Sequence, residues 1–203
     1  DSLARAAAAG VRMLIVPVDI ATEFPRKWSD TSTFTTWFEN ILRQARGAYT
    51  KLVEADLCVP CDIPAEYLFE HTYFMVGAHP YSAPDYNQEA EQRLFELLEH
   101  PLCVGVGEIG LDFGPYCEVS EEVQRKVFER QLSIAHEHNQ RVELHLRDGA
   151  DDTHAHDLAL EILNRMGVPK AGCDLHCYTD GPEVMKPFAD LGCFVAFGGA
   201  ATF

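Results

Sequence analysis

Cys103-Val-Gly-Val-Gly-Glu108 is a short apolar run, interrupted only by glycine, that ends on a carboxylate and continues into Ile-Gly-Leu. Apolar runs of roughly four to eight residues, bounded by Gly, Pro or charge, are typical of strands buried on both faces. Five more such runs occur, at residues 11–18, 73–78, 141–146, 173–177 and 193–197. The sequence therefore predicts six buried strands.

Helical patterns lie between these runs, at residues 3–9, 35–52, 84–99, 120–138, 157–166 and 182–191. The clearest follows Ser120, a suitable N-cap, with Val127, Phe128 and Leu132 at helical spacing. Alternating strands and helices predict a parallel sheet with helical crossovers, an α/β fold. Residues 21–70 are less regular, and we expect one helix and a loop over one end of the sheet there.

The charge of the chain limits its possible ligands. Its 203 residues include 16 Lys and Arg against 32 Asp and Glu, a formal net charge of −16. This balance argues against a basic face for nucleic acid or for anionic membrane. A polyanionic substrate would need another source of positive charge, such as a bound metal ion.

Seven cysteines make an odd count, and most lie in or beside apolar runs, where free cysteine behaves as a small hydrophobe. We therefore expect a reducing cytoplasm. Cys58-x-x-Cys61 has the spacing of a redox or zinc pair, but without a second pair it does not predict a closed zinc site. No run approaches the roughly 18 apolar residues of a membrane span, so we expect no membrane association.

Four polar side chains recur at the ends of successive strand runs: His79, Glu108, His145 and His176. Carboxyl ends of parallel strands meet at one rim of a barrel or sheet, so these residues are expected to converge. Imidazoles and a carboxylate are ligands for a divalent transition ion. Any one of these three histidines alone is more simply a half-buried polar residue. Four such side chains at equivalent positions along successive strands favour a metal site.

Glu108 carries the sharpest single argument, because a carboxylate inside an apolar strand end is costly unless a metal or partner compensates it. Arg147 lies two residues after His145 and so points to the same side of an extended strand. It is suited to gripping a phosphate or carboxylate. The alternative for Arg147 is a salt bridge to Glu143 or Asp148.

Two histidine pairs are weaker candidates. His154-x-His156 imitates a metal pair, but its polar surroundings favour a solvated loop that opens a helix. His136-x-His138 falls at a helix end, where cations suit the helix dipole. The sequence contains neither a Gly-x-Ser-x-Gly elbow nor a phosphate-binding loop ending in Gly-Lys-Ser/Thr, so serine hydrolase and P-loop functions lose support.

The chain resembles the TatD-type metal-dependent deoxyribonucleases. The resemblance rests on Val106-Gly-Glu-Ile-Gly-Leu-Asp-Phe113, Val76-Gly-Ala-His-Pro80, Leu144-His-Leu-Arg-Asp148, Leu175-His-Cys-Tyr-Thr179 and Phe197-Gly-Gly-Ala-Ala-Thr-Phe203. It implies a TIM-type (β/α)8 barrel carrying a two-metal site of the amidohydrolase type. The resemblance further implies that Glu108 bridges the metals, that His145 and His176 hold the second, and that His79, Arg147 and Tyr178 lie beside the substrate.

The chain departs from the family pattern at both ends. The family begins with a strand bearing an HxH pair and ends with a strand bearing an Asp, and neither is present here. We therefore expect an incomplete barrel holding strands two to seven, and a natural protein that continues at both ends. Smaller departures are Leu146, Asp180 and Gly181, where Ser, Gly and a small polar residue are usual.

These inferences predict a single metal-dependent hydrolase domain over residues 1–203. The expected activity is 3′-to-5′ exonuclease cleavage of single-stranded or frayed DNA by metal-activated water, with Glu108 and Arg147 as catalytic residues. The expected cofactors are two divalent ions per complete site, Zn²⁺, Mn²⁺ or Mg²⁺, in a cytoplasmic monomer. The alternatives are a small-molecule amidohydrolase or lactonase on the same barrel, and a catalytically incomplete scaffold that binds a partner protein.

Overall fold

The computed structural model describes residues 2–150 and 152–202, whose six strands form one sheet in chain order. All neighbouring strands are parallel, which confirms the expected α/β class. The strands are β1 Leu14–Asp19, β2 Thr72–Gly77, β3 Cys103–Asp112, β4 Arg141–Arg147, β5 Cys173–Leu175 and β6 Phe194–Val195. The sheet is not closed, because β1 and β6 form its two edges, as the expected incomplete barrel requires.

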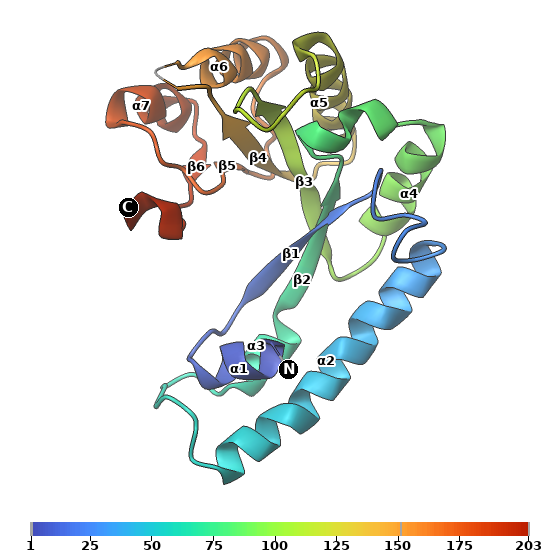
Figure 1. Cartoon of the computed structure of the whole chain (residues 1–203), viewed down its shortest axis with the longest axis vertical. Coiled ribbons are helices and arrows are strands. Elements are labelled where there is room, and N and C mark those ends of the chain that lie inside the picture. Colours follow the sequence, from blue (N-terminus) through green and yellow to red (C-terminus); the bar gives the residue numbers. More distant parts are fainter. Residues whose placement is uncertain (1, 151, 203) are drawn as a thin grey trace.

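Helices connect the strands and cover the sheet (Figure 1). They are α1 Ser2–Ala8, α2 Thr31–Glu54, α3 Glu66–Glu70, α4 Gln88–Leu98, α5 Glu121–Glu137, α6 His154–Met166 and α7 Pro182–Asp190, with the 3-10 helices η1 Pro80–Asp85 and η2 Gly199–Thr202. Each predicted helical pattern contains or overlaps one of these. The pattern at 84–99 is split, because Pro84 lies in η1 and the Asn87 side chain caps a new helix by accepting hydrogen bonds from Glu89 and Ala90.

In the segment expected to hold one helix and a loop, α2 contains the helix expected at residues 35–52 and begins four residues earlier, and its buried face carries Phe34 and Phe38. Both rings lie edge-on to Phe74 of β2, at centroid distances of 5.0 and 5.2 Å. Edge-to-face aromatic pairs add to the stabilisation from burial. The helix is therefore anchored to the sheet through one aromatic cluster, and its far end lies beside α1 and α3 (Figure 1).

Strand β3 holds an extra residue relative to its neighbours and runs four residues beyond its expected end at Glu108. Val106 pairs with Val142 of β4, whereas Ile109 pairs with Leu144, so three steps on β3 face two on β4. Such a bulge bends a strand and redirects a side chain. Here the shift falls between Val106 and Ile109, so the bulge includes Glu108.

Gly110 allows β3 and β4 to approach closely beside this bulge. A Cβ on Gly110 would lie 2.2 Å from the carbonyl oxygen of His145, and its φ of +144° is one that other residues rarely adopt. Only glycine therefore fits where β3 passes His145.

Two expectations from the sequence concern membrane-spanning segments and the cysteines. Within the described residues, no helix is long and apolar enough to cross a bilayer. All seven cysteines are free thiols, in agreement with the odd count.

Candidate metal centre

Four neighbouring strands bring the four predicted polar residues together. His79 follows β2, Glu108 and His145 lie within β3 and β4, and His176 follows β5. His79 Nε2 and His145 Nδ1 each lie 3.8 Å from Glu108 Oε2, and His176 Nε2 lies 3.5 Å from Glu108 Oε1. The predicted convergence is thus found, although Glu108 and His145 lie before their strand ends rather than at them.

Glu108 presents its two carboxylate oxygens to different imidazoles. Its side chain is 18% exposed, so the carboxylate is largely withdrawn from solvent but still accessible. Two ligand atoms that each lie about 2.1 Å from one ion are themselves roughly 3–4 Å apart. The separations around Glu108 fall in that range, which fits the chemistry of a metal-bridging carboxylate. His79, Glu108 and His145 together form a group able to hold one ion.

Asp112 fixes the orientation of the His145 ring. This fully buried carboxylate lies 2.8 Å from His145 Nε2 and accepts its proton in a hydrogen bond. The lone pair is then on Nδ1, which faces Glu108. A histidine whose second nitrogen donates to a carboxylate is the usual arrangement of a metal ligand.

The protonation states of the histidines also suit metal binding. Burial and the neighbouring His145 lower the pKa of His79 to about 4, and burial lowers the pKa of His145 despite its bond to Asp112. Both imidazoles are therefore neutral at pH 7, the form that binds metals. In contrast, the hydrogen bond to Glu143 raises the pKa of His176, whose Nδ1 lies 3.4 Å from the Glu143 carboxylate.

Arg147 points to the same side of β4 as His145, as predicted. The expected alternative partners, Glu143 and Asp148, are wrong: Arg147 Nη1 donates to the Tyr81 hydroxyl at 3.2 Å and lies 3.6 Å from Asp112 Oδ2. Its side chain remains 48% exposed. The guanidinium therefore stands beside the histidines with part of its donor capacity open to an anion.

Tyr178 is the predicted site residue that the structure does not bring to Glu108. It is buried, its hydroxyl donates to the Gly181 carbonyl at 2.6 Å, and its ring packs against His156 and Phe197. A substrate contact by Tyr178 stays a prediction.

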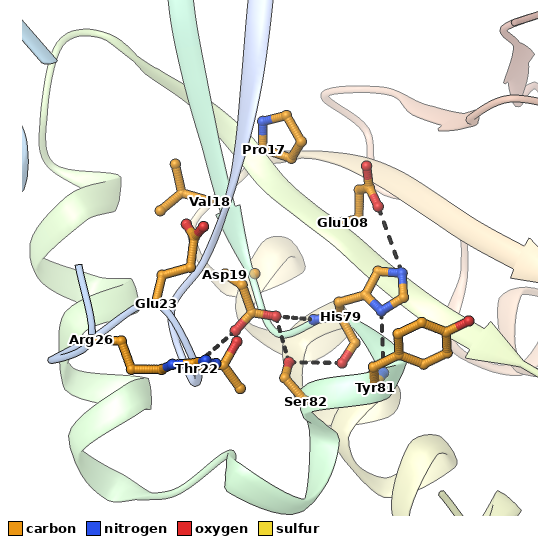
Figure 2. Close-up of a pocket in the computed structure, with 11 residues that line it drawn as sticks. Pro17, Val18, Asp19, Thr22, Glu23, Arg26, His79, Tyr81, Ser82 and Glu108 are labelled. Atoms are coloured by element: carbon orange, nitrogen blue, oxygen red, sulfur yellow. Dashed lines mark hydrogen bonds and ion pairs between the residues drawn. The ribbon is translucent and has the colours of Figure 1, made fainter. Parts of the chain in front are cut away.

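Sequence reasoning missed three acidic residues in and around the centre: Asp19, Asp112 and Glu143. Asp19 ends β1 and accepts hydrogen bonds from the His79 amide and the Ser82 hydroxyl, which fixes the turn carrying the imidazole (Figure 2). Asp19, His79 and Glu108 line a cavity of about 430 Å³. A signal was present for Asp19, which directly follows the apolar run at residues 11–18, whereas Asp112 lies four residues after the expected end of its strand.

The solvated-loop expectation for His154 and His156 is wrong. Helix α6 begins at His154, three residues earlier than expected, so both lie in its first turn. His156 is 2% exposed and bonded to Asp148, whereas His154 is half-exposed and bonded to Glu121 at 2.7 Å. Because the segment is a helical turn, His154 and His156 point in different directions and have different surroundings. A prediction that both lie in a solvated loop does not include this difference.

Comparison with known proteins places the chain in a family. The model of TatD related DNases matches residues 4–203. The chain belongs to this TatD family. A crystal structure of the TatD homologue YJJV from Escherichia coli K12 superposes with a TM-score of 0.66 and 27% identity, over 100% of this chain and 62% of that one.

Curated relatives match a shorter stretch. The uncharacterised metal-dependent hydrolase YabD of Bacillus subtilis is 30% identical over 66% of this chain and 50% of its own length. The 3′-5′ ssDNA/RNA exonuclease TatD of E. coli K12 is 32% identical over 61% of this chain and 45% of its own. Each match thus spans about half of the relative or less. The metal dependence of YabD and the donor set around Glu108 together support the predicted divalent metal cofactor.

Proposed function

We propose that this chain forms the metal-binding part of a TatD-type nuclease that hydrolyses phosphodiester bonds at the 3′ end of single-stranded or frayed DNA. The observation that carries the proposal is the placement of Glu108, with one carboxylate oxygen facing His79 and His145 and the other facing His176. Such a carboxylate is suited to bridging two divalent ions, the arrangement used for in-line displacement at phosphorus.

The proposed roles follow from the contacts. Glu108, His145 and His176 hold metal, with His79 as a further donor beside Glu108 Oε2, and the ions would supply Lewis-acid charge and activate water when bound. Asp112 keeps the proton of His145 on Nε2 and thereby directs Nδ1 toward Glu108. Arg147, positioned by the Tyr81 hydroxyl, binds a phosphate oxygen, and His79 lies beside it.

Charge decides how the substrate is held. With a net charge of −16, the chain has no general attraction for a long nucleic acid, so binding centres on the metals and Arg147. A short single-stranded end that presents one scissile phosphate fits this arrangement. The E. coli relative described as a 3′-5′ ssDNA/RNA exonuclease supports the same substrate class.

We further propose that residues 1–203 act as one hydrolase domain supplying strands two to seven of a barrel. The choice among Zn²⁺, Mn²⁺ and Mg²⁺, the monomeric state and the cytoplasmic location stay predictions. Of the alternatives, an amidohydrolase or lactonase on a small apolar substrate leaves the half-exposed Arg147 without a role. A partner-binding scaffold leaves the donor set around Glu108 without one.

Glu108→Gln tests this function, because it keeps the size of the side chain but removes its charge. We expect kcat/KM on a 3′-labelled single-stranded oligonucleotide with Mg²⁺ or Mn²⁺ to fall at least ~1000-fold, a loss of about 4 kcal/mol in transition-state stabilisation. Glu99→Gln, at an exposed position on the surface, is the matched control and should leave the rate unchanged. Unchanged hydrolysis in Glu108→Gln would overturn the proposal.

A further inference from the structure

A second group of metal-ligating side chains lies outside the proposed catalytic centre: Asp148, His156 and Asp180. Asp148 follows β4, His156 stands in the first turn of α6, and Asp180 follows β5 just before α7. Neighbouring loops at one edge of the sheet therefore bring the three together. The mechanism proposed above uses none of them.

The His156 ring is held in one orientation by Asp148. Its side chain is 3% exposed and that of Asp148 is 5% exposed, and His156 Nδ1 donates to Asp148 Oδ2. The other oxygen of Asp148 accepts the backbone N–H of Ala155, so the carboxylate is fixed as well. In the neutral tautomer that donates from Nδ1, the lone pair of the ring is on Nε2.

That lone pair faces a second carboxylate. His156 Nε2 lies 3.6 Å from Asp180 Oδ2, which is longer than a hydrogen bond. In that tautomer the nitrogen lone pair and the carboxylate oxygen can both bind a cation that lies between them. Two ligands that each lie about 2.1 Å from one tetrahedral ion are roughly 3.4 Å apart, close to the observed separation.

We propose that His156 Nε2 and Asp180 Oδ2 bind a second-site divalent cation of Zn²⁺ type, with Asp148 as the outer carboxylate that orients the histidine. Imidazole and carboxylate donors suit Zn²⁺, and a carboxylate behind the ligating ring is the common supporting arrangement. This site is additional to the centre at Glu108 and does not depend on nuclease activity.

The ion has a route to this site. Asp148 and Asp180 line a cavity of about 490 Å³ together with His145, Arg147 and His176. The Asp180 side chain is 40% exposed, so its oxygen is reachable from solvent. His156 is buried and does not line this cavity, so an ion would reach the site from the side of Asp180, and water or a substrate phosphate would complete its coordination. The site thus adds positive charge beside Arg147 in a strongly acidic chain.

Equilibrium dialysis against Zn²⁺ with metal analysis tests the site without any nuclease assay. We expect Asp180→Asn to remove one bound equivalent relative to the unmodified protein, or to weaken it at least ~10-fold. In the double variant Glu108→Gln/His176→Ala, one equivalent should persist and should disappear when Asp180→Asn is added. Asp62→Asn, also an exposed aspartate, is the matched control and should not change binding.

Because Asp180 is partly exposed, Asp180→Asn should fold, which circular dichroism confirms independently. Asp148→Asn should weaken the same equivalent ~10- to 100-fold, since it removes the orienting carboxylate. Identical Zn²⁺ stoichiometry and affinity in Asp180→Asn and the unmodified protein would overturn the proposal. So would protons on both His156 nitrogens by NMR at neutral pH in saturating Zn²⁺, because the group would then be an ion pair.

Discussion

The group around Glu108 and the group around His156 both combine histidine with carboxylates on the same side of the sheet, but they are built differently. The first draws its side chains from strands or from the one or two residues after them, and these side chains are about a tenth to a quarter exposed. In the second, a helix turn and two loops bury a histidine–aspartate pair almost completely. Strand ends therefore expose ligands for chemistry, whereas the α6 turn joins neighbouring loops and contributes to stability.

The largest expected difference between the two groups is in activity. His176→Ala removes a ligand from the Glu108 group, and we expect kcat/KM to fall ~1000-fold on a single-stranded oligonucleotide, about 4 kcal/mol. His176 is partly exposed and its pair with Glu143 is solvent-accessible, so the free energy of unfolding should change by less than about 1 kcal/mol. Urea titration measures the second quantity. Full activity combined with marked destabilisation would reverse the comparison.

His156→Ala should show the opposite balance in the free energy of unfolding. It leaves the Asp148 carboxylate buried without its imidazole partner, which costs about 3 kcal/mol. His154→Ala, two residues earlier on the same helix, is the control and should cost only a few tenths of a kcal/mol because its side chain is exposed. Equal urea midpoints for the two variants would show that the buried pair is not a source of stability.

This contrast also explains how far the sequence predicted the site. Periodic apolar runs predicted six parallel strands, and the phase of His79, Glu108, His145 and His176 predicted their convergence, because strand ends share one rim. The apolar runs did not predict the bulge in β3, because a bulge depends on how the strand pairs with β2 and β4. The local pattern of apolar residues therefore predicted neither the length of β3 nor the direction of the Glu108 side chain.

The burial of His156 lay outside local prediction for a related reason. Its partner Asp148 is eight residues earlier, and Asp180 is on another connection, so only the folded loops bring them together. A polar stretch such as residues 151–157 looks solvated until the start of the helix is known. The helix at residues 35–52 was expected from the sequence, but its aromatic anchoring on Phe74 is likewise a long-range contact that local pattern does not show.

Asp112→Asn should give an intermediate effect, because it acts on the Glu108 group through another residue. Asn is almost isosteric with Asp but cannot accept the His145 Nε2 proton as a carboxylate does, so the orientation of the ring loosens. We expect metal affinity, measured by the metal concentration at half-maximal activity, to weaken ~10- to 100-fold. High metal concentration should restore much of kcat.

Asp112 also lies 3.6 Å from Arg147, so Arg147→Gln is the control for that contact. It should raise KM for the oligonucleotide while leaving the metal dependence unchanged, because the guanidinium is proposed to hold phosphate. A metal dependence in Asp112→Asn equal to that of the unmodified protein would show that Asp112 serves Arg147 rather than His145.

The smallest expected effect separates the two histidines of the α6 turn. The hydrogen bond from His154 to Glu121 raises the pKa of His154 above 6.5, although both side chains are half-exposed. A raised pKa means that the pair stabilises the fold below pH 6.5 and that this contribution disappears as pH rises through the folded pKa. Glu121→Gln should therefore bring the NMR titration midpoint of His154 back toward 6.5.

Glu121→Gln should also lower Tm slightly at pH 5.5 relative to its effect at pH 8.5. Glu121 stands in the first turn of α5, and the loss of its favourable interaction with the helix dipole is the same at both pH values. Only the difference between the two pH values therefore reports the pair with His154. An unchanged NMR midpoint in Glu121→Gln would mean that this exposed contact does not persist in solution, whereas the buried pair of His156 and Asp148 still joins the turn to its neighbouring loop.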